Sequence, residues 1–223
     1  MEERYSRNVP AVSADDMDTL RRSRVLVVGC GGLGGFIIEY LARMGVGSLT
    51  VVDGDAFCPS NLNRQILSTV NNMGVNKAQA AADRVREINP DVTVRAVPEF
   101  LTKENAAGLM ADVDLVMDAL DNAGARFILE DAATEAGLAI VHGAICGWDL
   151  QVMLVPAGSR RLHQLYPANY TPGSKTSLPF TPAACAAMQA AVAVRYLCGQ
   201  TRESDRDLLV GSLRDLSFES IHF

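Results

Sequence analysis

The chain has 223 residues, of which 48% are hydrophobic and 21% charged, a composition typical of a globular protein. Its formal net charge of −6 argues against a broad nucleic-acid surface, which needs clustered Lys and Arg. The charged N-terminus differs from a signal peptide, and no segment reaches the roughly 18 apolar residues of a membrane span. We therefore expect a cytoplasmic protein with neither nucleic acid nor membrane as a partner.

The first predicted elements form a strand–helix–strand unit. Residues 24–29 are a β-branched run that ends in glycine, as expected for a strand buried on both faces. Residues 36–44 are long and apolar enough for a helix, which Gly45 and Gly47 end. A second strand at 49–53 completes the unit, whose crossover should be right-handed.

The same alternation continues more loosely along the chain. We predict helices at 77–88, 104–110, 126–136 and 183–197, and strands at 92–97, 114–118, 138–144, 151–155, 208–210 and 216–223. Residues 156–182 lack periodicity and predict a long loop. The fold class is α/β: a Rossmann-like, mainly parallel sheet with flanking helices and a C-terminal antiparallel extension. We expect residues 1–223 to form one domain, with 1–155 as its nucleotide-binding part and 183–223 as its C-terminal part.

A glycine-rich turn follows the first strand and opens the first helix of this unit. Its glycines allow a tight turn and close approach of a phosphate, which the helix N-terminus favours; they are Gly29, Gly31, Gly32 and Gly34. Asp53 ends the next strand, where a carboxylate can bind ribose hydroxyls. These residues predict a nucleotide site, but on this ground alone the nucleotide could be NAD, FAD or ATP.

The polar residues after Asp53 favour a triphosphate among these nucleotides. They comprise acidic, amide, hydroxyl and basic side chains at Asp55, Ser60, Asn61, Arg64, Gln65 and Lys77. A dehydrogenase has no use for such a cluster, whereas attack on an α-phosphate builds negative charge that Arg and Lys can neutralise. The alternative is a solvated polar loop with a surface salt bridge.

A second polar segment, residues 118–122, ends a strand at the sheet edge where open α/β sheets bind ligands. Asp121 is placed to hold Mg²⁺ against phosphates, because Mg²⁺ takes one or two carboxylates plus phosphate oxygens. The alternative for Asp121 is to cap the helix that starts near Ala125. We assign Asp118 a structural role and expect the neighbouring Leu120 and Asn122 to contact the nucleotide.

Taken together, these motifs resemble the ThiF/MoeB/HesA family, the bacterial relatives of the ubiquitin-activating enzymes. The matching pieces occur in the family's order up to about residue 143; they are RYSR at 4–7, GCGGLG at 29–34, DGD at 53–55, SNLNRQ at 60–65, GVNK at 74–77 and DALDN at 118–122. The resemblance implies a homodimer that uses ATP and Mg²⁺ to adenylate the C-terminal Gly-Gly of a ThiS- or MoaD-like ubiquitin-like sulfur carrier. The product would serve thiamin or molybdopterin-type cofactor synthesis.

The resemblance also implies roles for individual residues. Gly32 and Asp53 would contact the nucleoside, and Asn61, Arg64 and Lys77 the phosphates. Asp121 would position magnesium, and Arg7 would reach the γ-phosphate in the other subunit's site. The catalytic set implied in this way is Arg7, Arg64, Lys77 and Asp121. A carboxylate is already ionised at neutral pH, so alignment and charge stabilisation are sufficient without a general base.

The chain departs from the family pattern in its cysteines. Many members bind zinc through two CxxC pairs, but this sequence contains no CxxC, so we predict no zinc site. No cysteine lies between 157 and 184, and Cys185 starts an apolar helix, where a small buried residue is expected. We therefore expect adenylation without a covalent enzyme–carrier link.

Three alternatives stay open. One is an NAD-dependent oxidoreductase on the same glycine turn. Another is an adenylating enzyme that acts on a different peptide. A third is a non-catalytic subunit that pairs with an active relative, against which the retention of Arg64, Lys77 and Asp121 argues.

Overall fold

The computed structural model describes residues 3–167, 170 and 176–222, and one mixed sheet of eight strands runs through them. The strand order is β3-β2-β1-β4-β5-β6-β7-β8. The strands are β1 (Arg24–Val28), β2 (Ser48–Val52), β3 (Thr93–Val97), β4 (Leu115–Asp118), β5 (Ile140–Cys146), β6 (Asp149–Val155), β7 (Leu208–Ser212) and β8 (Ser217–Ile221). The first five pair in parallel and the last three are added antiparallel, which confirms the predicted fold class. The assignment of residues 1–223 to one domain stays a prediction.

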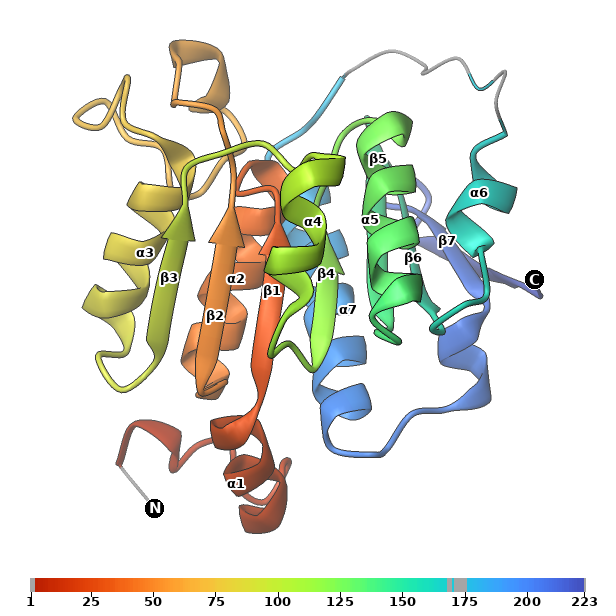
Figure 1. Cartoon of the computed structure of the whole chain (residues 1–223), viewed down its shortest axis with the longest axis horizontal. Coiled ribbons are helices and arrows are strands. Elements are labelled where there is room, and N and C mark those ends of the chain that lie inside the picture. The colour runs from red at the N-terminus through yellow and green to blue at the C-terminus, as the bar shows by residue number, and fades with distance from the viewer. Residues whose placement is uncertain (1–2, 168–169, 171–175, 223) are drawn as a thin grey trace.

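Helices cover both faces of the parallel part of the sheet (Figure 1). They are α1 (Ala14–Arg22), α2 (Gly32–Met44), α3 (Lys77–Ile88), α4 (Lys103–Met110), α5 (Ala123–Glu135), α6 (Arg161–Leu165) and α7 (Phe180–Leu197), with 3-10 turns η1 (Glu3–Tyr5), η2 (Pro59–Asn61) and η3 (Glu203–Arg206). Along β1, Val25 and Val27 pack in the core under α2, α3 and α7, while Leu26 and Val28 pack under α4 and α5. Because side chains alternate along a strand, a continuous apolar run is what a strand buried on both faces requires.

The structure differs from the predicted elements mainly in its helices; α2 begins at Gly32 rather than at 36, and α5 at Ala123 rather than at 126. Helix α1 was not predicted; only Met17 and Leu20 of its nine residues are buried, so its apolar stripe is short. Within the predicted loop 156–182 the chain forms the short helix α6, and α7 begins at Phe180 rather than at 183. Residues 168–169 and 171–175 of that predicted loop lie outside the described residues.

Candidate functional site

A cavity of about 710 Å³ lies at the carboxyl ends of β1, β2 and β4. In Figure 1 these three strands point toward the same edge of the sheet, the edge at which open α/β folds bind ligands. Eleven of the predicted nucleotide-site residues line the cavity: Gly29, Gly31, Gly32, Asp53, Asp55, Arg64, Gln65, Lys77, Leu120, Asp121 and Asn122. Gly34, Ser60, Asn61 and Arg7 are not among the lining residues.

The glycine turn leaves β1 and enters α2 with very little space around its backbone. Gly29 has φ of +97°, in the left-handed region that favours glycine. A Cβ at position 34 would lie 1.7 Å from the Gly29 carbonyl oxygen, so Gly34 is required for helix packing rather than for lining the cavity. Gly31 and Gly32 line the cavity at the N-terminus of α2, and a helix N-terminus favours an anion.

Asp53 supports the glycine turn directly. One of its carboxylate oxygens accepts a hydrogen bond from the Cys30 N–H at 2.8 Å, and the other accepts the Asp55 N–H at 2.8 Å. Burial raises the pKa of Asp53 above its ordinary value, although both hydrogen bonds act in the opposite direction. A carboxylate has about four lone-pair positions, so these two bonds still leave Asp53 able to accept ribose hydroxyls.

Some polar side chains of the segment around η2 line the cavity, and others form hydrogen bonds within the segment. Arg64 and Gln65 line the cavity, and the buried Gln65 Oε1 has no hydrogen-bond partner among the described residues. Asn61 is buried, and its Oδ1 accepts the Cys58 N–H at 3.1 Å. The Ser60 carbonyl accepts a hydrogen bond from Arg64 Nη1 at 3.0 Å, which orients the guanidinium.

Lys77 forms the first residue of α3 and is only 7% exposed. Its Nζ lies 2.9 Å from Asp55 Oδ2, so the lysine predicted to bind phosphate forms an ion pair with a carboxylate at the cavity wall. Asn76 caps α3 through the Gln79 N–H and also donates to the backbone carbonyls of Asp53 and Asp55. The β2 end and the α3 start are thereby tied together.

At the end of β4, the structure separates the two alternatives for Asp121. Asn122, not Asp121, caps α5, because its Oδ1 accepts the Ala125 N–H at 2.8 Å. Asp121 is exposed and lines the cavity, with Asn122 Nδ2 3.5 Å from its Oδ1. A carboxylate in the cavity therefore stands where the sequence predicts a magnesium ligand.

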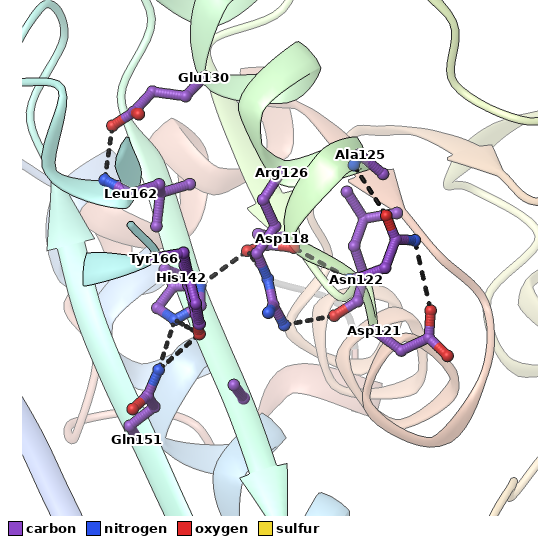
Figure 2. Close-up of polar contacts among 12 residues, drawn as sticks. Asp118, Asp121, Asn122, Ala125, Arg126, Glu130, His142, Gln151, Leu162 and Tyr166 are labelled. Atoms are coloured by element: carbon purple, nitrogen blue, oxygen red, sulfur yellow. Dashed lines mark hydrogen bonds and ion pairs between the residues drawn. The ribbon is translucent and has the colours of Figure 1, made fainter. Parts of the chain in front are cut away.

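Asp118 lies directly beneath this turn in a buried polar network (Figure 2). It is fully buried, and its Oδ2 accepts hydrogen bonds from Arg126 Nε at 3.1 Å and His142 Nδ1 at 2.7 Å. Burial alone would raise the pKa of Asp118, but the Arg126 charge and the His142 hydrogen bond outweigh it and lower that pKa. Burial lowers the pKa of His142, although the neighbouring Asp118 carboxylate acts in the opposite direction.

The cavity extends beyond the residues predicted to bind a nucleotide, to a second half that the sequence analysis does not predict. Gln151 on β6 and Tyr166, which ends α6, line this half and bond to each other and to His142. The Tyr166 ring lies 4.8 Å from the Arg126 guanidinium carbon. Of these residues, only Arg126 could have been inferred from the sequence, because a buried aspartate such as Asp118 needs a cation nearby.

The segment before α7 closes one side of the cavity. Thr176 and Ser177 line it; the Thr176 carbonyl accepts the Gly147 N–H, and the Ser177 carbonyl accepts Asn63 Nδ2 at 3.1 Å. This short stretch therefore joins the η2 side of the cavity to the β5–β6 turn. Its neighbours 171–175 lie outside the described residues.

Two further predicted features can be placed in the fold. Cys185 is fully buried and its thiol contacts the Ala144 and Gln151 carbonyls, as expected for a small core residue. The exposed Cys146 lines the cavity, so the absence of a covalent step stays a prediction.

None of the helices in the described part of the chain meets the length and apolarity that crossing a membrane requires.

Comparison with solved structures shows the fold. The chain superimposes on the crystal structure of PaaA with a TM-score of 0.82 at 23% identity, covering 98% of this chain and 72% of that one. For Escherichia coli MccB with ATP the TM-score is 0.79 at 18% identity, covering 99% and 71%. These identities support a shared architecture and nothing finer.

Curated relatives found by sequence are more similar to this chain in sequence than these solved structures are. The SAMP-activating enzyme E1 of Haloferax volcanii is 37% identical over 230 residues, covering 99% of this chain and 85% of that protein. The sulfur carrier protein adenylyltransferase of Thermus thermophilus is 35% identical over 235 residues, covering 98% and 86%. The named relatives are adenylyltransferases, which confirms the predicted enzyme class. A model of the ThiF family matches residues 5–222, and the chain accordingly belongs to the ThiF family.

Proposed function

We propose that this protein uses ATP and Mg²⁺ to adenylate the C-terminal glycine carboxylate of a small ubiquitin-like sulfur carrier. The observation that carries the proposal is one continuous cavity that joins the glycine turn, Arg64, Lys77 and Asp121 to a second half at Tyr166. The first half suits a nucleotide, and the second has room for an extended chain terminus. Two relatives are named for activating SAMP and for adenylating a sulfur carrier.

The chemistry requires alignment rather than proton transfer. The carrier's carboxylate is already an anion, so it can attack the α-phosphate once it lies in line with the leaving pyrophosphate. Arg64 and Lys77 line the cavity and can neutralise charge on the phosphate oxygens. Lys77 would exchange Asp55 for a phosphate when the triphosphate binds, because both compete for the same ammonium group.

Magnesium fits the donor set at Asp121. The described residues contain no group of three or more His, Cys, Asp or Glu side chains that could enclose a metal alone. Mg²⁺ bound to a nucleotide needs only one or two carboxylates, because phosphates and waters supply the other oxygens. The exposed Asp121 carboxylate at the cavity wall meets this need, and when bound the ion would neutralise phosphate charge.

The predicted role of Arg7 requires a second subunit. The segment before α1 docks at the amino ends of the strands, far from the cavity edge (Figure 1), because Asn89 binds the Tyr5 hydroxyl at 2.6 Å. Arg7 is exposed two residues later and does not line its own chain's cavity. The proposed role of Arg7 at a γ-phosphate therefore depends on another copy of the chain, and the homodimer and this role stand or fall together.

We expect Arg7→Ala to lower turnover much more than ATP affinity, because the side chain would neutralise the charge that develops on the leaving pyrophosphate. Mixing inactive Arg7→Ala subunits with inactive Asp121→Ala subunits should restore part of the activity, since each mixed dimer keeps one complete site. Steady-state kinetics on the single and mixed samples measures this. Unchanged turnover in Arg7→Ala, or no recovery on mixing, would rule out the role across the dimer.

The substrate itself is tested by incubating the enzyme with ATP, Mg²⁺ and a carrier protein that ends in Gly-Gly. Mass spectrometry should find AMP attached at the carrier's C-terminal glycine, and no adduct when that glycine is deleted. An adduct on an unrelated peptide but on no carrier would instead support the peptide-adenylating alternative. We expect the reaction in the cytoplasm, for thiamin or molybdopterin-type cofactor synthesis.

A further inference from the structure

The backbone N–H and the backbone carbonyl of Leu120 both bond to one buried ion pair, Asp118 and Arg126. The N–H donates to Asp118 Oδ1 at 2.9 Å, and the carbonyl accepts from Arg126 Nη2. The next residue is Asp121, whose carboxylate lines the cavity. We propose that Arg126 is a positioning residue that fixes the direction of the Asp121 carboxylate for magnesium, an inference that rests on the proposed function.

The anchor for this clamp is rigid. Asp118 is fully buried, and its remaining groups are also engaged: Oδ2 with His142 at 2.7 Å, and its backbone carbonyl with Gln189 Nε2 at 2.9 Å. Arg126 is 5% exposed and donates Nε to the same Asp118 oxygen. Buried networks in which several hydrogen bonds converge on one carboxylate restrict its geometry, so the turn that this network holds has little freedom.

Arg126 also touches the opposite half of the cavity. Its guanidinium carbon lies 4.8 Å from the centre of the Tyr166 ring, within the range of a cation–π contact. Figure 2 shows Arg126 between Asp118 and the turn that carries Asp121 and Asn122. One guanidinium therefore links the wall where the carrier tail would lie to the turn that presents the metal ligand.

The geometry requires arginine rather than any cation. Nε and Nη2 donate in two directions, one to a carboxylate and one to a carbonyl, whereas a lysine ammonium presents a single point on a flexible stem. Arg126→Lys would keep a positive charge beside Asp118 and loosen the Leu120 carbonyl. A matched control is Arg195→Lys, because Arg195 binds both oxygens of Asp205 and lies outside the cavity.

The test is calorimetric titration of Mn²⁺ into the ATP complex, a readout independent of turnover. We expect Arg126→Lys to weaken Mn²⁺ binding by about 10- to 100-fold, as loss of an outer-shell partner does, with ATP affinity in EDTA unchanged. Arg195→Lys should match the wild type. In an Asp121→Asn background, Arg126→Lys should have no further effect on Mn²⁺ affinity, because the route through Asp121 is already lost.

Two results would overturn the proposal: unchanged Mn²⁺ affinity in folded Arg126→Lys, or an equally large loss in the Asp121→Asn background. If Arg126→Lys fails to fold by circular dichroism, the Asp118→Asn, Arg126→Gln double variant replaces it, since no buried charge is then left unpaired. The double variant should also weaken Mn²⁺ binding. Failure of the carrier reaction alone would contradict the proposed function and leave these binding results to decide the role of Arg126.

Discussion

Asp121→Ala is expected to lower the rate of adenylate formation by about 100- to 1,000-fold, the range seen when one charge-stabilising group is removed. The carboxylate lies at the cavity wall after β4 and is the magnesium ligand in our account. The fold should persist, because Asp121 is exposed and Asn122 supplies the cap of α5. Single-turnover kinetics and thermal melting of the same sample measure the two effects separately.

A matched control removes the same chemical group elsewhere. Asp83 is an exposed aspartate on α3, paired with Arg86 at the surface, where such a pair contributes at most about 1 kcal/mol. Asp83→Ala should therefore leave adenylation at the wild-type rate. If Asp121→Ala instead unfolded the protein, its lost activity would follow from lost stability, and the catalytic assignment of Asp121 would be wrong.

Asp118→Asn is expected to lower the free energy of unfolding by about 3–5 kcal/mol, because it leaves the buried Arg126 charge without a counterion. For a chain of this length the melting temperature should fall by about 10 °C. Arg126 is 5% exposed, and a guanidinium is not deprotonated in proteins, so Arg126 stays charged and unpaired in the variant. Denaturant unfolding followed by circular dichroism measures the loss.

The same strand offers a control at its exposed beginning. Asp114, just before β4, accepts hydrogen bonds from Arg24, and both side chains are more than one-third exposed. Asp114→Asn should cost only about 1 kcal/mol. The Asp118→Asn, Arg126→Gln double variant should recover part of the loss, because it removes the unpaired charge. A double variant less stable than either single variant would show that the unpaired charge is not the cause.

Most of the sheet follows from local sequence patterns. The β-branched run that forms β1 and the glycines that follow it define the first strand, turn and helix, and Lys77–Ile88 is the helix that its pattern predicts. Helix α1 could have been found from Ser13, whose side chain caps it by accepting the Asp16 N–H. Its short apolar stripe gave no periodic signal over a full window.

Helix α6 could not be predicted, because distant residues hold it. Glu130 on α5 accepts the N–H groups of Leu162 and His163 at 2.8 and 3.0 Å, and the Arg206 carbonyl accepts from Arg161. Five residues are too few for a helix to be stable alone. Tertiary contacts of this kind leave no pattern in the segment itself.

The nucleotide half of the site was largely predictable, and the second half was not. Asp53, Lys77 and Asp121 each follow a strand or begin a helix, so parallel-sheet topology brings them to one edge. In the second half, His142 is fully buried. Its contact with Tyr166, 24 residues away, forms only when α6 packs beside β5 and β6.

Carrier-dependent exchange of pyrophosphate into ATP tests the central claim most directly, because it detects reversible formation of an acyl-adenylate. The proposed function predicts exchange that requires Mg²⁺ and the terminal glycine of a ThiS- or MoaD-like carrier, and that Asp121→Ala slows by about 100- to 1,000-fold. Clear ATP binding without exchange for any such carrier would contradict it. Exchange that persists with a carrier lacking its terminal glycine would contradict it equally.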